Sequence, residues 1–331
     1  MRFGVVIPTY GRFGDPGAIR ALIDQAEAVG FESAWFGDHV VVPGYAAQAT
    51  DPHWYEALTC AIHGMGHTTR LSFGTDVLAL PCREPLLLAK MAATASLLSG
   101  GRLSVGVGVG FLRGEFEALG APDYDQRGAV TDELLEVLRL ALTTTGPASF
   151  DGRWVRFEDL HFGPLPAAPP PLLVGGNGDR ALRRAAALGD GWHPLWPTPE
   201  RYAEGRRRIL ELRDQAGTTR PFTFSYSCPH TVLRDAPAPS AGSPAHHSGA
   251  LGPDYAYVPA LPHAPDGRVR FTGTAEQLRD DVAAFAAAGV EQLVVRLWIP
   301  SDEALTVDGH VALMERFMRE VGGLSPRDTS V

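Results

Sequence analysis

The sequence predicts an α/β protein built as a (β/α)₈ TIM barrel. Short apolar runs without internal alternation recur along the 331 residues, and each is followed by a longer segment with helical periodicity. Continuous apolar runs are typical of parallel strands that helices cover on one face. Because about eight such units follow one another, we expect the strands to close into a barrel. An open, doubly wound sheet is the alternative, since such a pattern does not count strands reliably.

The expected strands are short, as the strands of a barrel are. Between them, apolar residues recur at a spacing of about 3.6, as in the helix expected over residues 18–31. Residues 131–143 and 274–290 follow the same pattern, and we expect Thr274 to begin the second of these helices and Gly289 to stop it. The strands are expected over residues 3–8, 34–36, 71–77, 103–108, 172–174, 191–193, 222–227 and 292–296.

We expect a single domain over residues 1–331, interrupted by two insertions. Residues 146–171 predict a small strand or hairpin after the fourth barrel strand. Residues 229–270 are rich in Pro, Ala, Gly and Ser and follow the seventh strand. A loop after a barrel strand lies on the active-site face, and a loop of this length is usually functional or mobile. We therefore interpret residues 229–270 as a lid, with a disordered loop of no function as the alternative.

Composition and motifs exclude several classes of protein. A formal net charge of −9 argues against a nucleic-acid or anionic-membrane partner. Apolar runs are too short to span a bilayer and the N-terminus does not resemble a secretory signal, so we expect a cytoplasmic protein. Three cysteines without a CxxC spacing predict neither a disulfide framework nor a metal site. No nucleophile elbow, HExxH motif or P-loop supports a hydrolase, a metalloprotease or an NTPase.

Two glycine-rich stretches are candidate nucleotide sites. In LSVGVGVGFLRGEFEALG, residues 103–120, the glycines are spaced G-x-G-x-G, which is not the dinucleotide fingerprint. Glycines on one face of this strand would let a flat ligand approach the backbone, or would only meet the need for small residues at a barrel corner. In LLVGGNGDRALRRAAALGDGW, residues 172–192, the amides of residues 175–178 precede a helix and predict a phosphate site. The acidic residue of an NAD site is not clearly placed after it.

Five sequence blocks occur in order along nearly the whole chain. They are RFGVVIPTYG, AEAVGFESAWFGDHVVVP, LSFGTDVLALPCREPLLLAKMAATASLLSGGRLSVGVGVGF, EFEALG and LLVGGNGDRALRRAAALGDGW. Together they resemble the bacterial-luciferase-like superfamily, and within it the coenzyme F420-dependent oxidoreductases. The resemblance implies a (β/α)₈ barrel that binds a flavin or deazaflavin at the C-terminal ends of its strands.

The resemblance also implies a set of site residues. Asp38 and His39, in GDHV, end the second strand, and His39 becomes the candidate proton donor or substrate orienter. Without the resemblance, a single histidine after a strand is more often structural. The resemblance further implies a third-strand bulge with a non-prolyl cis peptide, expected at Asp76–Val77, a fourth-strand end under the ring and a phosphate loop. The cofactor-binding candidates are Thr75, Asp76, Val77, Gly108, Gly110, Phe111, Gly175, Gly176 and Asn177.

The sequence departs from the sugar-phosphate dehydrogenases of this family in two places. Those enzymes have a carboxylic acid directly after the fourth strand and a tryptophan shortly after the second-strand histidine. Here Phe111 and the segment VVVPGY occupy these places, which favours an apolar substrate pocket. Glu115 is a candidate catalytic carboxylate nearby, with a surface glutamate at a helix start as the alternative.

Two enzymatic hypotheses follow. The first is an F420-dependent oxidoreductase that transfers a hydride between the deazaflavin and a small, hydrophobic organic substrate, while His39 manages the proton. The second is a two-component monooxygenase that uses O₂ and FMNH₂ supplied by a separate flavin reductase. The sequence DHV rather than EHH after the second strand favours F420 over FMN. A non-catalytic protein of the same fold is a third alternative, against which the phosphate loop argues. A homodimer is the assembly that we consider.

Overall fold

The computed structural model describes residues 1–47, 51–238, 260–298 and 306–323. Within these ranges, eight parallel strands follow one another around a barrel, and β12 returns to pair with β1. The predicted barrel is confirmed. Its strands, in spatial order, are β1 (Arg2–Val6), β2 (Ser33–Phe36), β3 (Ser72–Thr75), β5 (Leu103–Gly108), β8 (Leu172–Val174), β9 (Gly191–Trp192), β10 (Thr223–Leu233) and β12 (Gln292–Leu297).

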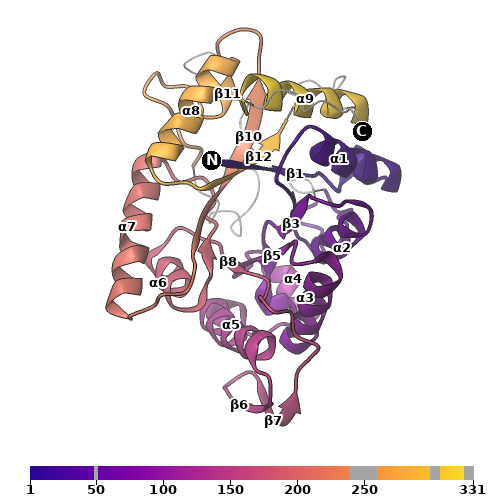
Figure 1. Ribbon diagram of the computed structural model, residues 1–331, viewed down its shortest axis with the longest axis vertical. Coiled ribbons are helices and arrows are strands. Elements are labelled where there is room, and N and C mark those ends of the chain that lie inside the picture. The colour runs from indigo at the N-terminus through magenta and orange to yellow at the C-terminus, as the bar shows by residue number, and fades with distance from the viewer. Residues whose placement is uncertain (48–50, 239–259, 299–305, 324–331) are drawn as a thin grey trace.

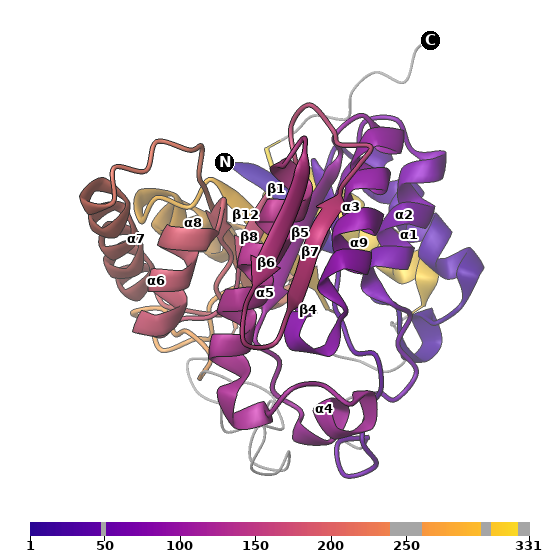
Figure 2. The same cartoon turned by 90° about the horizontal axis from the view of Figure 1, so that it is seen from below.

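Helices surround the strands, as Figure 1 shows. Helix α4 lies apart from this ring, beyond one end of the strands (Figure 2). None of the helices in the described part of the chain is both long enough and apolar enough to cross a bilayer. They are α1 (Pro16–Ala28), α2 (Ala57–His67), α3 (Pro85–Ser99), α4 (Arg113–Leu119), α5 (Arg127–Thr143), α6 (Asp179–Leu188), α7 (Pro199–Gln215), α8 (Ala275–Ala287) and α9 (Val307–Glu320).

Local sequence signals fix several of these helix ends. The Asp15 carboxylate accepts a hydrogen bond from the backbone N–H of Ala18, which caps α1, and Pro16 occupies its first turn. The expected N-cap of α8 is confirmed: Thr274 and Gln277 form a reciprocal capping box. These caps set where each helix leaves the loop that precedes it.

Trp35 fills the centre of the barrel. It lies on β2, and its indole Nε1–H donates to the Ser33 hydroxyl at 2.8 Å. A Cβ atom at Gly4 or Gly74 would lie 2.7 Å or less from the Trp35 ring, so the neighbouring strands β1 and β3 carry glycine beside it. Trp35 packs with Val6, Leu173 and Val294, and the His193 ring stacks on it at 4.8 Å between centroids.

Most expected strands differ from the observed ones by one or two residues at an end, and two differ in a way that bears on the site. The third expected strand, residues 71–77, ends as β3 at Thr75, and the short β4 (Leu78–Ala79), which pairs with β5, follows just beyond its expected end. The Asp76–Val77 peptide bond between them is cis, as the resemblance implies. Strand β10 continues to Leu233 rather than ending at residue 227, because it pairs with the short β11 (Thr272–Gly273) beyond its pairing with β12.

The structure describes all of the first expected insertion and only part of the second. Residues 147–161 form an antiparallel hairpin of β6 (Pro147–Asp151) and β7 (Arg156–His161) that pairs with itself, apart from the barrel sheet (Figure 2). In the second insertion, residues 229–233 belong to β10, and residues 239–259, the middle of the expected lid, lie outside the described residues.

Candidate active site

The side chains of His39 and Glu115 meet at the C-terminal end of the barrel. His39 follows β2, Glu115 lies in the first turn of α4, and their Nδ1 and Oε2 atoms are 3.4 Å apart. The Glu115 carboxylate also accepts from the backbone N–H groups of Val40 and Val41, at 2.7 and 3.3 Å. With 2% of its surface exposed, Glu115 is not the surface residue of the alternative interpretation. An ionised carboxylate only accepts hydrogen bonds, so in a contact with ionised Glu115 the His39 Nδ1–H is the donor.

Aromatic rings enclose His39. The Trp54 ring meets it edge-on with 5.2 Å between centroids, and the Phe111 ring does so at 5.6 Å. Tyr10 packs in turn on Trp54 at 4.3 Å. The imidazole is therefore a polar group in an apolar surround.

Asp38 makes different contacts from those of its neighbour His39. Its carboxylate accepts from the Arg83 guanidinium at 2.6 Å and from the Ala79 backbone N–H at 3.2 Å. Burial raises the pKa of Asp38 above its usual value, although the Arg83 charge opposes the rise. Arg83 also binds the Glu56 carboxylate at 2.9 Å. The structure thus places the Asp38 side chain among groups that anchor β4.

Asp76 lies at the centre of a polar cluster inside the barrel. Its carboxylate accepts from three donors: His193 Nε2 at 2.9 Å, the Ser227 hydroxyl at 3.1 Å and Arg296 Nη2 at 2.7 Å. His193 Nδ1 is 2.7 Å from the Ser225 hydroxyl, and the ring stacks on Trp35. Burial by itself would raise the pKa of Asp76, but the His193 hydrogen bond and the Arg296 charge outweigh it and lower the pKa.

Sequence reasoning missed the partners of Asp76. His193, Ser225, Ser227 and Arg296 come from β10, β12 and the end of β9, far along the chain from residue 76. One signal was available: Arg296 is the single charge in the apolar strand QLVVRL. A charge in such a strand is retained only where it has a partner.

The alternating glycines of β5 accommodate the neighbouring strand. A Cβ atom at Gly106 would lie 2.0 Å from the Thr75 carbonyl oxygen, and one at Gly108 would lie 2.7 Å from Cγ2 of Val77. The Thr75 hydroxyl donates to the Gly106 carbonyl at 2.8 Å. A Cβ atom at Gly175 would lie 3.4 Å from the same Val77 methyl, at an ordinary contact distance. The structure thus brings together predicted residues from three strand ends, and Val77 occupies the room that the glycines leave.

Gly110 and Phe111 form the turn from β5 towards α4. Gly110 has φ +72°, and a Cβ atom there would lie 2.7 Å from the Phe116 ring. Both observations explain glycine at this position. The Phe111 carbonyl accepts from the Tyr124 hydroxyl at 2.6 Å, which fixes the turn while the Phe111 ring faces His39.

The loop before α6 contains the predicted phosphate residues. Gly176 has φ +100°, a conformation that favours glycine, and its carbonyl accepts from Trp192 Nε1 at 2.9 Å. The Asn177 amide donates to the Leu195 carbonyl at 2.6 Å, so it braces the loop. Gly178, the N-cap of α6, has no side-chain cap, and apart from its own chain neighbours no described atom lies within 4 Å of the place of its missing Cβ. An open, uncapped helix N-terminus behind a glycine loop fits a phosphate group.

The described residues hold no cluster of three or more metal-binding side chains. Cys60, Cys82 and Cys228 are free thiols. The polar side chains of the site are histidines, carboxylates, arginines and hydroxyls, of which the histidines and carboxylates can exchange protons.

Comparisons with known proteins agree with this architecture. In fold, the chain is similar to an F420-dependent secondary alcohol dehydrogenase in complex with an F420–acetone adduct, with a TM-score of 0.77, 19% identity and coverage of 97% of this chain and 98% of that one. It is 30% identical over 171 residues to an F420-dependent glucose-6-phosphate dehydrogenase from Amycolatopsis mediterranei, covering 51% of this chain and 50% of the relative.

A second kind of relative uses FMN. The chain is 32% identical over 177 residues to an FMNH₂-dependent dimethylsulfone monooxygenase from Pseudomonas putida, covering 53% of this chain and 47% of the relative. The family model described as luciferase-like monooxygenase matches residues 1–292. Members of this family are flavin- or F420-dependent oxidoreductases or monooxygenases. The chain therefore belongs to the luciferase-like monooxygenase family, and it is an enzyme of that flavin- or deazaflavin-dependent class.

Proposed function

We propose that this enzyme is an F420-dependent oxidoreductase that transfers a hydride between the deazaflavin and a small, hydrophobic organic substrate. The observation that carries the proposal is the His39–Glu115 pair at the barrel mouth, where a buried carboxylate holds an imidazole among aromatic rings. An imidazole in this position can act as a general acid or base towards a substrate.

The proposed roles follow from the contacts. Glu115 orients the His39 ring through Nδ1, so that Nε2 gives a proton to the substrate during reduction or takes one during oxidation. When bound, F420 supplies or accepts the hydride. Phe111 and Trp54 exclude water from the imidazole and give the substrate an apolar surface. Asp38, through Arg83 and Ala79, positions β4 behind this surface and acts as a positioning residue.

The cofactor residues have separate roles in the proposal. Gly175, Gly176 and Asn177 lead into the uncapped N-terminus of α6 and would hold the cofactor's phosphate. Val77, wedged against Gly108 and Gly175, would form the surface on which the ring rests. Asp179, in the first turn of α6, is itself negative, but Arg183 binds its carboxylate at 2.7 Å, which reduces the repulsion of a phosphate.

The second candidate is an FMN-dependent monooxygenase of the two-component type, with FMNH₂ from a separate flavin reductase and O₂ as co-substrate. The similarity to the dimethylsulfone monooxygenase favours it. In that case His39 would serve substrate orientation.

Cofactor affinity distinguishes the two candidates. The full-length protein is titrated with F420, with FMN and, under anaerobic conditions, with FMNH₂, and the dissociation constants are measured by calorimetry. We expect F420 to bind at least about tenfold more tightly than either form of FMN, a difference of about 1.4 kcal/mol. Tight binding of FMNH₂ with weak binding of F420 would reverse the assignment in favour of the monooxygenase.

The role of His39 is tested by His39→Ala in steady-state turnover with a substrate that the wild type converts. We expect turnover to fall by about 10²- to 10⁴-fold, as is typical for loss of a proton-transfer group, with F420 affinity retained. His63→Ala, at an exposed histidine of α2, is the matched control and should leave turnover unchanged. Unchanged turnover in His39→Ala would remove His39 from the mechanism.

A further inference from the structure

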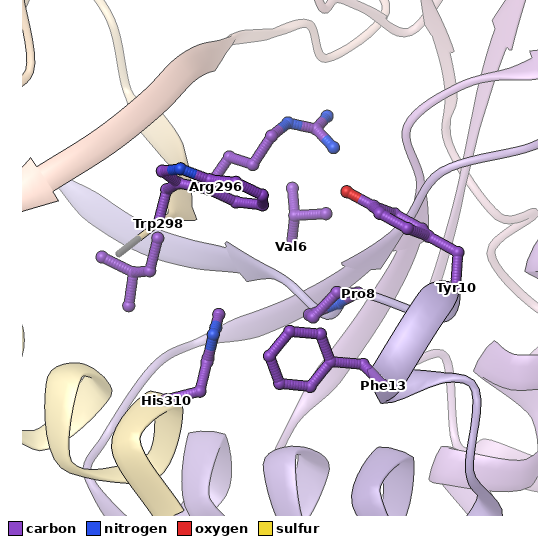
Figure 3. Close-up of a pocket in the computed structure, with 8 residues that line it drawn as sticks. Val6, Pro8, Tyr10, Phe13, Arg296, Trp298 and His310 are labelled. Carbon is purple, nitrogen blue, oxygen red and sulfur yellow. The ribbon is translucent and has the colours of Figure 1, made fainter. Parts of the chain in front are cut away.

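A cavity opens at the barrel mouth between β1, β12 and α9 (Figure 3). Its enclosed part has a volume of about 20 Å³, enough for one water-sized group, and the rest of the hollow is open to solvent. Val6, Phe13 and Trp298 give it apolar walls. The Trp298 ring stacks on His230 with centroids 4.7 Å apart, which holds this wall in place.

The cavity adjoins the candidate active site on two sides. Arg296 lines it and also binds Asp76 beside the cis peptide. Tyr10 lines it and packs on Trp54, which in turn contacts His39. A molecule that reached from His39 over Trp54 would therefore enter this cavity.

His310 is a polar group in the cavity wall with its hydrogen-bonding capacity unused. It lies in the first turns of α9, 2% of its surface is exposed, and Phe13 packs edge-on against it at 5.3 Å. Neither of its ring nitrogens has a hydrogen-bond partner among the described residues. Figure 3 shows the ring at the cavity, between Phe13 and Trp298. A buried polar group of this kind is destabilising unless a ligand or water satisfies it.

The charges around the cavity favour a neutral ligand. Burial lowers the pKa of His310 to about 4, so the ring is neutral near pH 7 and offers one donor and one acceptor. The positive charge of Arg296 is balanced by the Asp76 carboxylate at 2.7 Å. The cavity thus combines apolar walls with a neutral imidazole.

We propose that this cavity is a binding subsite for a neutral hydroxyl or carbonyl group on a small apolar molecule, with His310 as its hydrogen-bond partner. The subsite rests on the proposed function and extends it, because the end of the substrate that is remote from His39 would bind here. The binding itself requires no cofactor, so it is tested independently of F420.

Three probes of similar shape test the subsite: phenol, toluene and benzoate. The full-length protein, labelled with ¹⁵N-histidine, is titrated with each, and binding is followed through the ring-nitrogen chemical shifts of His310. His310→Phe identifies these signals and provides the variant, because phenylalanine keeps the volume and the packing on Phe13 while it removes both nitrogens. His63→Phe, on the exposed face of α2, is the matched control.

We expect phenol to shift the His310 signals and to bind at least about tenfold more tightly than toluene or benzoate. In His310→Phe this preference for phenol over toluene should disappear, whereas His63→Phe should keep it. Equal affinities for phenol and toluene in the wild type, tighter binding of benzoate, or saturation with phenol without a shift of His310 would each overturn the proposal. Even if His310→Phe fails to fold, the chemical-shift changes and affinities measured with the wild type test whether His310 binds the hydroxyl group. If the wild type binds phenol as expected but does not prefer F420 to FMN in the cofactor titration, the proposed function is contradicted and the subsite is not.

Discussion

Asp38 and Asp76 are two buried aspartates in the same barrel mouth, and their pKa values move in opposite directions. Each accepts a hydrogen bond from an arginine, at 2.6 Å from Arg83 and at 2.7 Å from Arg296. Burial raises the pKa of Asp38, whereas the hydrogen bond from His193 and the charge of Arg296 lower the pKa of Asp76 despite burial. An arginine at hydrogen-bond distance therefore does not by itself decide whether the pKa of a buried aspartate is raised or lowered.

The difference lies in the other neighbours. Asp76 gains two further donors, His193 and Ser227, whereas Asp38 gains one backbone N–H and faces the negative charges of Glu56 and Glu115. A buried carboxylate stays ionised where donors outnumber competing acceptors. The Asp76 cluster is thus suited to hold a carboxylate in its charged form. Around Asp38, by contrast, the single charge of Arg83 is shared between the carboxyl groups of Asp38 and Glu56.

The largest expected effect is that of Asp76→Asn. The substitution keeps the shape of the side chain but leaves the Arg296 charge without its buried partner, so we expect the free energy of unfolding to fall by about 3–5 kcal/mol at pH 7. Urea unfolding measures it. Asp24→Asn is the control, because its half-exposed pair with Arg20 should contribute less than about 0.5 kcal/mol. A loss below about 1 kcal/mol for Asp76→Asn would mean that its charge is not what holds the cluster.

His310 shows what burial does when no partner opposes it. Its pKa is about 4 in the folded chain against 6.5 when unperturbed, so the unfolded chain binds more protons between these values. Its contribution to stability is full above pH 6.5 and is lost as the pH falls towards 4, by about 3 kcal/mol. The free energies of unfolding of the wild type and His310→Phe, compared from pH 7.5 to 4, measure this loss. If the free energies of unfolding of the two proteins change in parallel with pH, the expected loss from His310 is contradicted.

The smallest effect is expected for Asp38→Asn. Arg83 keeps Glu56 at 2.9 Å and burial no longer opposes a charge, so we expect a change of about 1 kcal/mol or less at pH 7. Because the folded pKa of Asp38 is raised above its ordinary value of 3.8, the native state takes up a proton before the unfolded chain as the pH falls towards 3.8, and the wild type gains stability relative to Asp38→Asn.

The same comparison with Asp76→Asn has the opposite sign. Since the folded pKa of Asp76 is lowered, the wild type keeps its advantage above pH 3.8 and loses it below. Urea unfolding of all three proteins between pH 7 and about 2.5 measures both trends. If the two variants follow the same trend, burial alone governs both carboxylates.

Much of the fold could be predicted from the sequence, because barrel strands and helices are encoded locally. The strands over residues 103–108 and 172–174 were predicted with their observed ends. The end of β10 could not be predicted, since its last residues are paired by residues 272–273, about 40 positions later along the chain. Such pairing depends on where distant segments meet rather than on local pattern.

The candidate site was predicted in part. His39 and Asp76 follow strands and belong to blocks of the family resemblance, so both could be named in advance. The contact between His39 and Glu115 joins residues 76 positions apart, and that between Asp76 and Arg296 joins residues 220 apart. His310 could not be singled out, because an amphipathic helix such as α9 gives no sign of which of its buried side chains lacks a partner.

The close approach of Val77 to β5 limits how this protein and its relatives can evolve. The Val77 methyl group occupies the place that a side chain at residue 108 would need. A larger residue at position 108 is therefore acceptable only in a sequence that already carries a smaller residue at position 77. In a large set of related sequences, the side-chain volumes at positions 77 and 108 should covary, and the substitution at position 77 should come first.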